Sequence, residues 1–285
     1  MDCRTTAPAR ARAASRLLSL IFLWLAMLVA AFHAATASAQ ASGEADVLRQ
    51  ARAYQERYRA GDVGVVPAYV SLLDTATRDF PNDANVWYAL GVAYLAQAAT
   101  ALLPGGNAAD AMVPMQKGPA ALWKALQLEP EHAEALAQLG AVQAMLGPVL
   151  QRPAMLTRGI AQMNQAVQKS PGSVRVRLQR AFIGLSLPDD LRDHAAEAAD
   201  LEFLSEAADF GRPGDYVRLL RADLHAEQMQ PDEARALYAF VAATGSAAAA
   251  SEARSRLAAL AAGGVPTADI KALRVAAGAK CAMCH

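Results

Sequence analysis

Two cysteines and a histidine occupy the last five residues of the 285-residue chain, in the order Cys281-Ala282-Met283-Cys284-His285. Thiolates are nucleophiles and metal ligands, and the neutral imidazole is the commonest side-chain ligand for metals. This C-x-x-C-H spacing suits a group bound by two sulfurs and one ring nitrogen, but it also suits a disulfide or a metal half-site. Zinc is the weaker metal candidate, because a structural zinc site takes four ligands and the segment offers three.

The other cysteine, Cys3, lies in a segment that we expect to be removed, so the mature chain carries all its cysteine in this motif. The motif resembles the attachment site of c-type cytochromes, in which both thiols form thioethers to one haem and the histidine ligates its iron. This resemblance implies one covalent haem c, held by Cys281 and Cys284, with His285 as an axial iron ligand. A redox-active or inert dithiol and an accidental or truncated motif remain open.

The residues before the motif indicate a helix over Asp269–Ala277, which resembles the first helix of a class I cytochrome c domain. In that family the second iron ligand comes from a methionine further along the chain, and no residue follows His285 here. We therefore expect an exposed haem with an open or weakly capped iron. Five residues elsewhere are candidates for a borrowed ligand: His132, His194, His225, Met112 and Met115.

The N-terminus has the pattern of a secretory signal peptide. Four arginines precede an apolar stretch over Leu17–Phe32, and Ala37-Ser38-Ala39 forms an A-x-A cleavage site. We expect residues 1–39 to be removed and Gln40 to begin the mature protein, with an uncleaved membrane anchor as the alternative. An exported chain with this motif is predicted to be periplasmic, without a stable membrane anchor after cleavage.

Charge and motifs argue against two classes of function. Removal of residues 1–39 takes away four arginines and one aspartate, which leaves a net charge of −3 and no basic run. Nucleic acid is therefore not an expected partner. The sequence also lacks a nucleophile motif, a phosphate-binding loop and H-E-x-x-H, so the protein is not predicted to be an enzyme.

A repeat signature begins after Pro81. Trp87, Leu90, Gly91 and Tyr94 spell W-x2-L-G-x2-Y, which resembles the first helix of a tetratricopeptide repeat (TPR). Large residues at this spacing share one helix face, and the glycine permits a partner helix to approach closely. We expect Trp87 to be buried between helices.

The signature recurs twice with increasing divergence. After Pro130, Leu136 takes the tryptophan position, and the leucine and glycine are kept as Leu139 and Gly140. A third copy after Pro171 carries arginines and an alanine at the same positions: Arg177, Arg180 and Ala181.

The periodicity over residues 40–262 predicts an all-α, TPR-like superhelical array of antiparallel helix pairs. Residues 263–285 are expected to form a hinge and the C-terminal haem-attachment helix. Besides the first helices of the three copies, the pattern predicts helices over Glu44–Ala60, Val65–Phe80, Pro119–Leu128, Leu156–Lys169, Asp189–Phe210, Asp215–Met229, Pro231–Ala243 and Ser246–Ala262.

The repeats are longer than the roughly 34 residues of a standard TPR. Insertions over Ala101–Gly118 and Gly147–Pro153 account for the excess in the first two copies. Both lie between the two helices of a pair, so we expect them on one edge, bordering a partner site. Five methionines lie in or near them, and either metal binding or packing explains these: Met112, Met115, Met145, Met155 and Met163.

Together these features predict an exported scaffold for protein–protein interaction that carries one haem for electron transfer or ligand sensing. Its partner would be a periplasmic protein, such as a redox protein. The alternative is a haem-free periplasmic adaptor in envelope assembly or cytochrome maturation, with Cys281 and Cys284 as a thiol pair.

Overall fold

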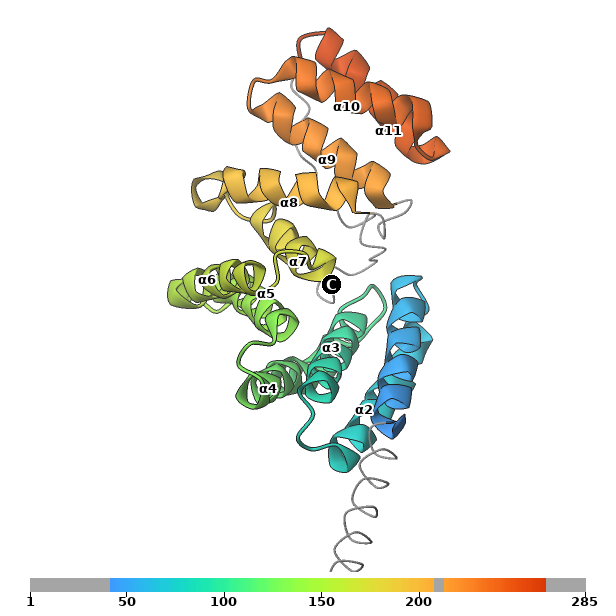
Figure 1. Ribbon diagram of the computed structural model, residues 1–285, viewed down its shortest axis with the longest axis vertical. Coiled ribbons are helices and arrows are strands. Elements are labelled where there is room, and N and C mark those ends of the chain that lie inside the picture. Colours follow the sequence, from blue (N-terminus) through green and yellow to red (C-terminus); the bar gives the residue numbers. More distant parts are fainter. Residues whose placement is uncertain (1–41, 208–212, 265–285) are drawn as a thin grey trace, which may run out of the picture. The chain divides into compact units, whose positions relative to one another are not determined.

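The computed structural model describes residues 42–207 and 213–264, and these form helices and turns without a strand (Figure 1). The predicted signal peptide and the haem-attachment segment lie outside the described residues. Chain contacts divide the protein into two compact units, Met1–Arg49 and Gln50–His285. The described part of the first unit, residues 42–49, is helical, and the second unit begins with the helical residues 50–59.

The remaining helices of the second unit follow one another with short connections. They are η1 (Val63–Val65), α2 (Val66–Asp79), α3 (Ala84–Ala101), η2 (Ala108–Ala111), α4 (Met112–Leu128), α5 (Ala133–Val149), α6 (Pro153–Lys169), α7 (Val174–Gly184), η3 (Asp189–Leu191), α8 (His194–Glu206), α9 (Pro213–Glu227), α10 (Pro231–Thr244) and α11 (Ala247–Ala261).

Sequential helices pack in pairs, as Figure 1 shows. Helix α3 packs against α4, α5 against α6, α7 against α8, and α9 against α10, while α11 packs on α10. Each pair also contacts the next, through α4 with α5, α6 with α7, and α8 with α9. The predicted all-α, TPR-like array of antiparallel helix pairs is thereby confirmed.

Close approach within the α5–α6 pair depends on two glycines that face each other. A β-carbon on Gly140 would lie 2.7 Å from the Gly159 carbonyl oxygen, and one on Gly159 would lie 2.3 Å from that of Gly140. Both distances are far below van der Waals contact, so a side chain at either position would force the backbones apart. The repeat-motif glycine therefore has the packing role that the sequence predicts.

The first helix of each of the three copies begins with the same device. The residue two positions after each motif proline is the N-cap, and its side chain accepts a backbone N–H three residues on. Asp83 accepts from Val86 at 2.8 Å, and Ser173 accepts from Val176 at 3.3 Å. In the second copy His132 takes this position and starts α5. The divergent third copy therefore keeps the start signal of the motif.

The prediction that Trp87 is buried between helices is wrong, because this side chain is only partly buried. Its indole N–H donates to the carbonyl of Pro81, six residues earlier, at 2.9 Å. Arg177, at the equivalent position of the third copy, uses its Nε to donate to the carbonyl of Pro171 at 2.7 Å. In the first and third copies this position thus holds a long side chain whose N–H donates to the preceding turn, whereas Leu136 of the second copy is buried in the core.

The third pair adds a buried ion-pair network to its apolar contacts. Asp200 of α8 is fully buried and accepts hydrogen bonds from Arg180 at 2.7 and 2.8 Å and from Arg177 at 2.9 Å. Arg177 also lies over the Phe203 ring, 4.6 Å from its centroid, and Arg180 donates to Asn164 of α6. The arginines at the tryptophan and leucine positions are therefore compatible with packing, because α8 supplies their counter-charge.

The two predicted insertions are mostly helix. Helix α4 begins at Met112, seven residues before the predicted start, and Pro119 lies inside it. The early turns bury Pro114 and place Gly118 against Leu95 of α3, and the helix continues through Pro119 although the proline removes one backbone hydrogen bond. The second insertion likewise lengthens α5 and α6 and leaves a three-residue connection, 150–152. The helix predicted over Asp189–Phe210 is shorter than expected. It corresponds to α8, which begins at His194 because Asp193 is its N-cap.

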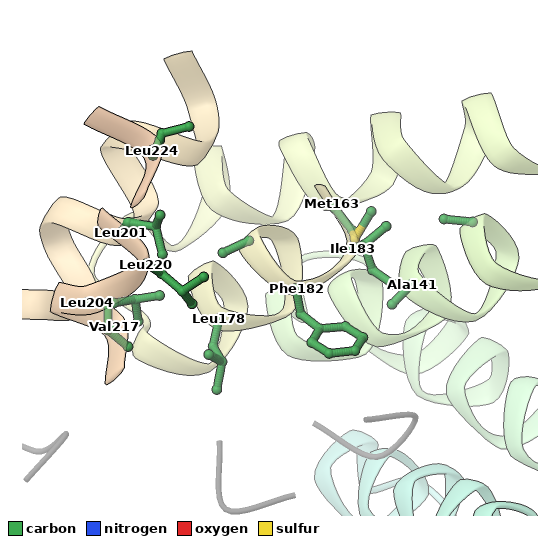
Figure 2. Packing of buried hydrophobic residues seen from close by; sticks show 12 residues of the cluster. Ala141, Met163, Leu178, Phe182, Ile183, Leu201, Leu204, Val217, Leu220 and Leu224 are labelled. Atoms are coloured by element: carbon green, nitrogen blue, oxygen red, sulfur yellow. The ribbon is translucent and has the colours of Figure 1, made fainter. Parts of the chain in front are cut away.

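The described core contains two large clusters that share α9. Figure 2 shows the first, in which Val217, Leu220 and Leu224 of α9 join buried residues of α5 to α8. In the second, Leu219, Ala222 and Ala226 of the same helix pack with residues of α10 and α11, among them the fully buried Tyr238. Helix α9 is thus apolar on both sides.

Beside the second cluster lies a buried acid. Asp223 of α9 is fully buried, and its Oδ1 accepts hydrogen bonds from Tyr238 at 2.6 Å and from Arg256 of α11 at 2.7 Å. Its other oxygen, Oδ2, has no hydrogen-bond partner among the described residues. Burial disfavours the charged form and raises the pKa of Asp223 to about 6, although the bonds from Tyr238 and Arg256 act in the opposite direction.

This shift predicts a pH-dependent stability. A carboxyl in the unfolded chain titrates at about 3.9, so the folded state binds the proton more tightly. The stabilisation that protonated Asp223 gives the folded state is complete below about pH 4 and is lost as the pH rises through about 6. This loss lowers the free energy of unfolding by on the order of 2–3 kcal/mol. We expect Asp223→Asn to gain stability relative to the wild type by this amount between pH 4 and pH 7 in urea unfolding. A pH-independent difference would contradict the assignment.

Candidate functional site

The predicted haem-binding residues Cys281, Cys284 and His285 lie outside the described residues, so their placement stays a prediction. Within residues 42–207 and 213–264, no group of three or more His, Cys, Asp or Glu side chains is arranged to hold a metal ion. No helix there is long and apolar enough to cross a membrane. The candidate site must therefore be built from cavities, methionines and charged clusters.

The three predicted histidines lie on separate helices and have local structural contacts. His132 is buried, and its Nδ1 accepts the Ala135 N–H at 3.3 Å as the N-cap of α5. His194 begins α8, with Nδ1 3.5 Å from a Glu197 carboxylate oxygen. His225 Nδ1 lies 2.6 Å from Gln230 Oε1. The structure therefore does not bring these histidines together.

The five methionines near the predicted insertions differ in how deeply they are buried. Met163 is buried in the core, as the packing interpretation predicts, and Figure 2 shows it beside Ile183. Met112 has 64% of its surface exposed at the start of α4. Met145 of α5 is half-buried and lines a cavity. Of the five, Met145 alone lines the cavity described next.

A cavity of ≈ 750 Å³ lies between the α5–α6 connection and the segment that follows α7. Its lining is mainly apolar, and it includes residues of the predicted insertion Gly147–Pro153. The residues that line it are Ala144, Met145, Gly147, Pro148, Gln151, Arg152, Pro153, Leu156, Ile183, Ser186, Leu187, Pro188 and Leu191. The second insertion therefore borders this cavity.

The margin of this cavity is rigid and partly apolar. Three of its lining residues are prolines, and Gln151 adopts a left-handed backbone conformation with φ 53° in the α5–α6 connection. Next to them Val149, Leu150 and Leu191 are exposed apolar residues, and Val149 has 75% of its surface exposed. A preformed apolar cavity with an apolar rim suits a ligand or segment that buries apolar surface.

Arg152 is the charged residue of the lining. Its side chain is exposed, and it has no ion-pair partner in the described ranges. A guanidinium donates paired hydrogen bonds to carboxylates or phosphates and is almost always charged. The site thus combines apolar walls with one cation at its edge.

Apart from the cavity, helix packing brings together a cluster of polar side chains that lie far apart in the sequence. Tyr88 of α3 is buried beside His132, with ring centroids 5.0 Å apart, and burial raises the pKa of its hydroxyl. Arg175 lies near both Tyr88 and Glu134, and its guanidinium is 3.4 Å from the Glu134 carboxylate. Burial and the nearby Arg175 lower the pKa of Arg59. No local sequence signal reveals this cluster, because helix packing assembles it.

Comparisons with known proteins give little beyond the fold. No protein-family model matches the chain, and no curated protein matches it. Among solved structures, it is similar to the crystal structure of a thermophilic TPR protein of Thermus thermophilus, at 17% identity and a TM-score of 0.49. That similarity covers 77% of this chain and 99% of the other. The TPR-like character of this chain therefore rests on its own capped, glycine-spaced helix pairs.

Proposed function

We propose that this protein is an exported periplasmic scaffold for protein–protein interaction that carries one covalent c-type haem. The observation that carries the proposal is the confinement of all predicted mature cysteine to Cys281 and Cys284, followed directly by His285. The predicted signal peptide supports export, and paired helices offer the extended surfaces that repeat proteins use for binding. The role is one of binding and electron transfer or ligand sensing rather than of catalysis.

The described residues fit such a group in their chemistry. Haem has a large apolar macrocycle and two carboxylates, and the cavity beside α5 offers apolar walls with Arg152 at its edge. Met145 adds a thioether, a known type of ligand for haem iron. When bound, the haem would supply reversible iron redox chemistry or coordination of a small ligand, while the helix pairs bind the partner protein.

Covalent attachment can be tested directly. The full chain is expressed with a cytochrome maturation system, and the periplasmic protein is run on a denaturing gel and stained for haem peroxidase activity. We expect a stained band and the mass of one haem, both lost in the Cys281→Ser/Cys284→Ser double variant. Cys3→Ser is the matched control, because it removes a cysteine from the predicted signal peptide and should leave the stain unchanged.

The same preparation separates the proposal from the haem-free alternative. An unstained, folded wild-type protein with two alkylatable thiols after reduction would refute haem attachment and favour the adaptor with a thiol pair. A stain that persists in the double-serine variant would show that Cys281 and Cys284 are not the attachment residues.

A further inference from the structure

Most of the large apolar side chains that the described residues expose lie at one edge of the helix array. In an array of antiparallel pairs, the connections within pairs share one edge, and the connections between pairs share the other. Exposed apolar residues lie in or beside the connections within four successive pairs: Leu102, Met112, Val149, Leu150, Leu191 and Met229. We call this set the apolar edge. The described connections between pairs, 80–83, 129–132 and 170–173, expose no large apolar side chain.

The apolar edge is more than a scatter of single residues. Exposed apolar residues that occur singly need no explanation, whereas a contiguous set marks an interaction surface. Successive connections are in fact neighbours, because the cavity of ≈ 750 Å³ is lined by both the α5–α6 connection and the segment after α7. These are the two middle connections of the four, so the cavity lies within the apolar edge.

Both walls of the cavity are held by backbone hydrogen bonds. In one wall the Arg152 N–H donates to the Gly147 carbonyl at 2.8 Å, and in the other the Leu187 N–H donates to the Gly184 carbonyl at 3.0 Å. A pocket that is already formed costs little ordering entropy when it is filled. Such a pocket inside an apolar surface suits the insertion of a large apolar side chain, which is how binding interfaces gain most of their affinity.

Arg152 gives the cavity a preference for negative charge. Its side chain is exposed in the lining, and it has no ion-pair partner in residues 42–207 and 213–264. By contrast, Arg177 and Arg180 of the neighbouring α7 are both paired with Asp200. An unpaired guanidinium binds a carboxylate through two parallel hydrogen bonds. The expected occupant therefore carries a carboxylate next to apolar groups.

The charges along the edge argue against two other occupants. Asp110 and Asp190 lie in the α3–α4 and α7–α8 connections and are exposed, so an anionic membrane surface would be repelled on both sides of Arg152. In a two-fold dimer centred on the cavity, the Arg152 side chains of the two copies would face each other without a counter-charge. Like charges placed so close cost binding free energy.

We propose that the apolar edge binds a segment of another protein, which inserts a large apolar side chain into the cavity and pairs an aspartate or glutamate with Arg152. This inference deepens the scaffold part of the proposed function and is independent of haem attachment. It assigns the cavity to the partner protein rather than to the haem, and it places the partner at the connections within the helix pairs.

A library of random peptides displayed on phage is the probe, and it is selected against the purified wild-type chain. We expect the selected peptides to combine large apolar side chains with at least one aspartate or glutamate. Their affinities are then measured with synthetic peptides by fluorescence anisotropy. The haem-free Cys281→Ser/Cys284→Ser variant should bind them as tightly as the wild type does.

Two variants of the edge should each weaken binding by about tenfold or more. Leu150→Asp places a charge in the exposed apolar surface, and Arg152→Glu reverses the charge of the lining. Trp123→Asp is the control for the first, because Trp123 is as exposed as Leu150 but lies on α4, away from the edge. Arg158→Glu is the control for the second, because Arg158 is exposed and lies outside the lining. Circular dichroism verifies the fold of each variant.

A charge exchange tests the ion pair itself. Replacing the acidic residue of a selected peptide by lysine should weaken its binding to the wild type and restore binding to Arg152→Glu. The affinity of the original peptide for the wild type should also fall as salt is added, because an exposed ion pair is screened. A lysine peptide that binds both proteins equally would remove Arg152 from the proposal.

The remaining outcomes separate failure of this site from failure of the scaffold. Peptides that bind the wild type and both edge variants equally overturn the site, while the scaffold function stands. A selection that enriches no peptide overturns both. Dimers that dissociate in Leu150→Asp, measured by analytical ultracentrifugation, would assign the edge to a second copy. Sedimentation with phosphatidylglycerol vesicles that is lost in Leu150→Asp would assign it to a membrane, and peptides that bind only the haem-free variant would assign the cavity to the haem.

Discussion

Replacement of Asp200 by alanine should lower the free energy of unfolding by about 3–5 kcal/mol, as measured by urea unfolding followed by circular dichroism. Asp200 is fully buried in α8, and its two oxygens accept hydrogen bonds from Arg177 and Arg180 of α7. Without this carboxylate two guanidiniums remain largely buried without their counter-charge. Such a loss costs far more than the net value of the pair itself.

Asp232→Ala is the matched control. Asp232 also pairs with an arginine, Arg235, at 2.6 Å, but its side chain has 87% of its surface exposed. Exposed ion pairs of this kind contribute about 0–1 kcal/mol. Equal losses in the two variants would show that the α7–α8 network does not depend on burial. The triple change Arg177→Leu/Arg180→Leu/Asp200→Leu tests the same point, since an apolar replacement should recover much of the loss.

The second large effect is expected at the contact between α5 and α6. Gly159→Ala would place a β-carbon 2.3 Å from the Gly140 carbonyl oxygen and 2.6 Å from the Ala144 backbone nitrogen. Since both atoms belong to the backbone, rotation of a side chain cannot relieve the overlap. We expect a loss at or above the usual overpacking cost of about 1–3 kcal/mol. The melting temperature should fall accordingly.

Gly172→Ala provides the comparison, because a β-carbon there meets nothing within 4 Å. It should be neutral or slightly stabilising, since alanine reduces the entropy of the unfolded chain. The Gly159 variant should also disturb the cavity, whose lining includes Ala144 and Leu156 from the same two helices. An unchanged melting temperature in Gly159→Ala would mean that the helices separate at little cost.

The repeat pattern predicted most of the fold because helix starts and close contacts are encoded locally. The motif prolines mark each start, and Gly140 marks the closest helix contact, so both could be read without a structure. The sequence did not reveal how Arg177 and Arg180 could be packed, because their counter-charge Asp200 lies at least 20 residues further on. Long-range pairing of this kind leaves no signal in local periodicity.

The site was less predictable for a similar reason. The Gly147–Pro153 insertion was expected to border a partner site; residues of this insertion line the cavity, and a partner there stays a prediction. The opposite wall, at Ile183 and the residues that follow α7, becomes its neighbour only through helix packing. Of the candidate ligands, Met112 is exposed and His132 is the N-cap of α5. The sequence does not distinguish Met145 from the other four methionines near the insertions.

The two-sided burial of α9 sets how the array can come apart. Val217, Leu220 and Leu224 belong to one core cluster, and Leu219, Ala222 and Ala226 belong to the other. A stacked array behaves as a one-dimensional chain of units coupled to their neighbours, and a unit with strong coupling on both sides is the last to fray. Unfolding from the α11 side should therefore halt at α9. In hydrogen exchange, α10 and α11 should lose amide protection together and before α9. Under mechanical force they should unfold first, as one cooperative segment.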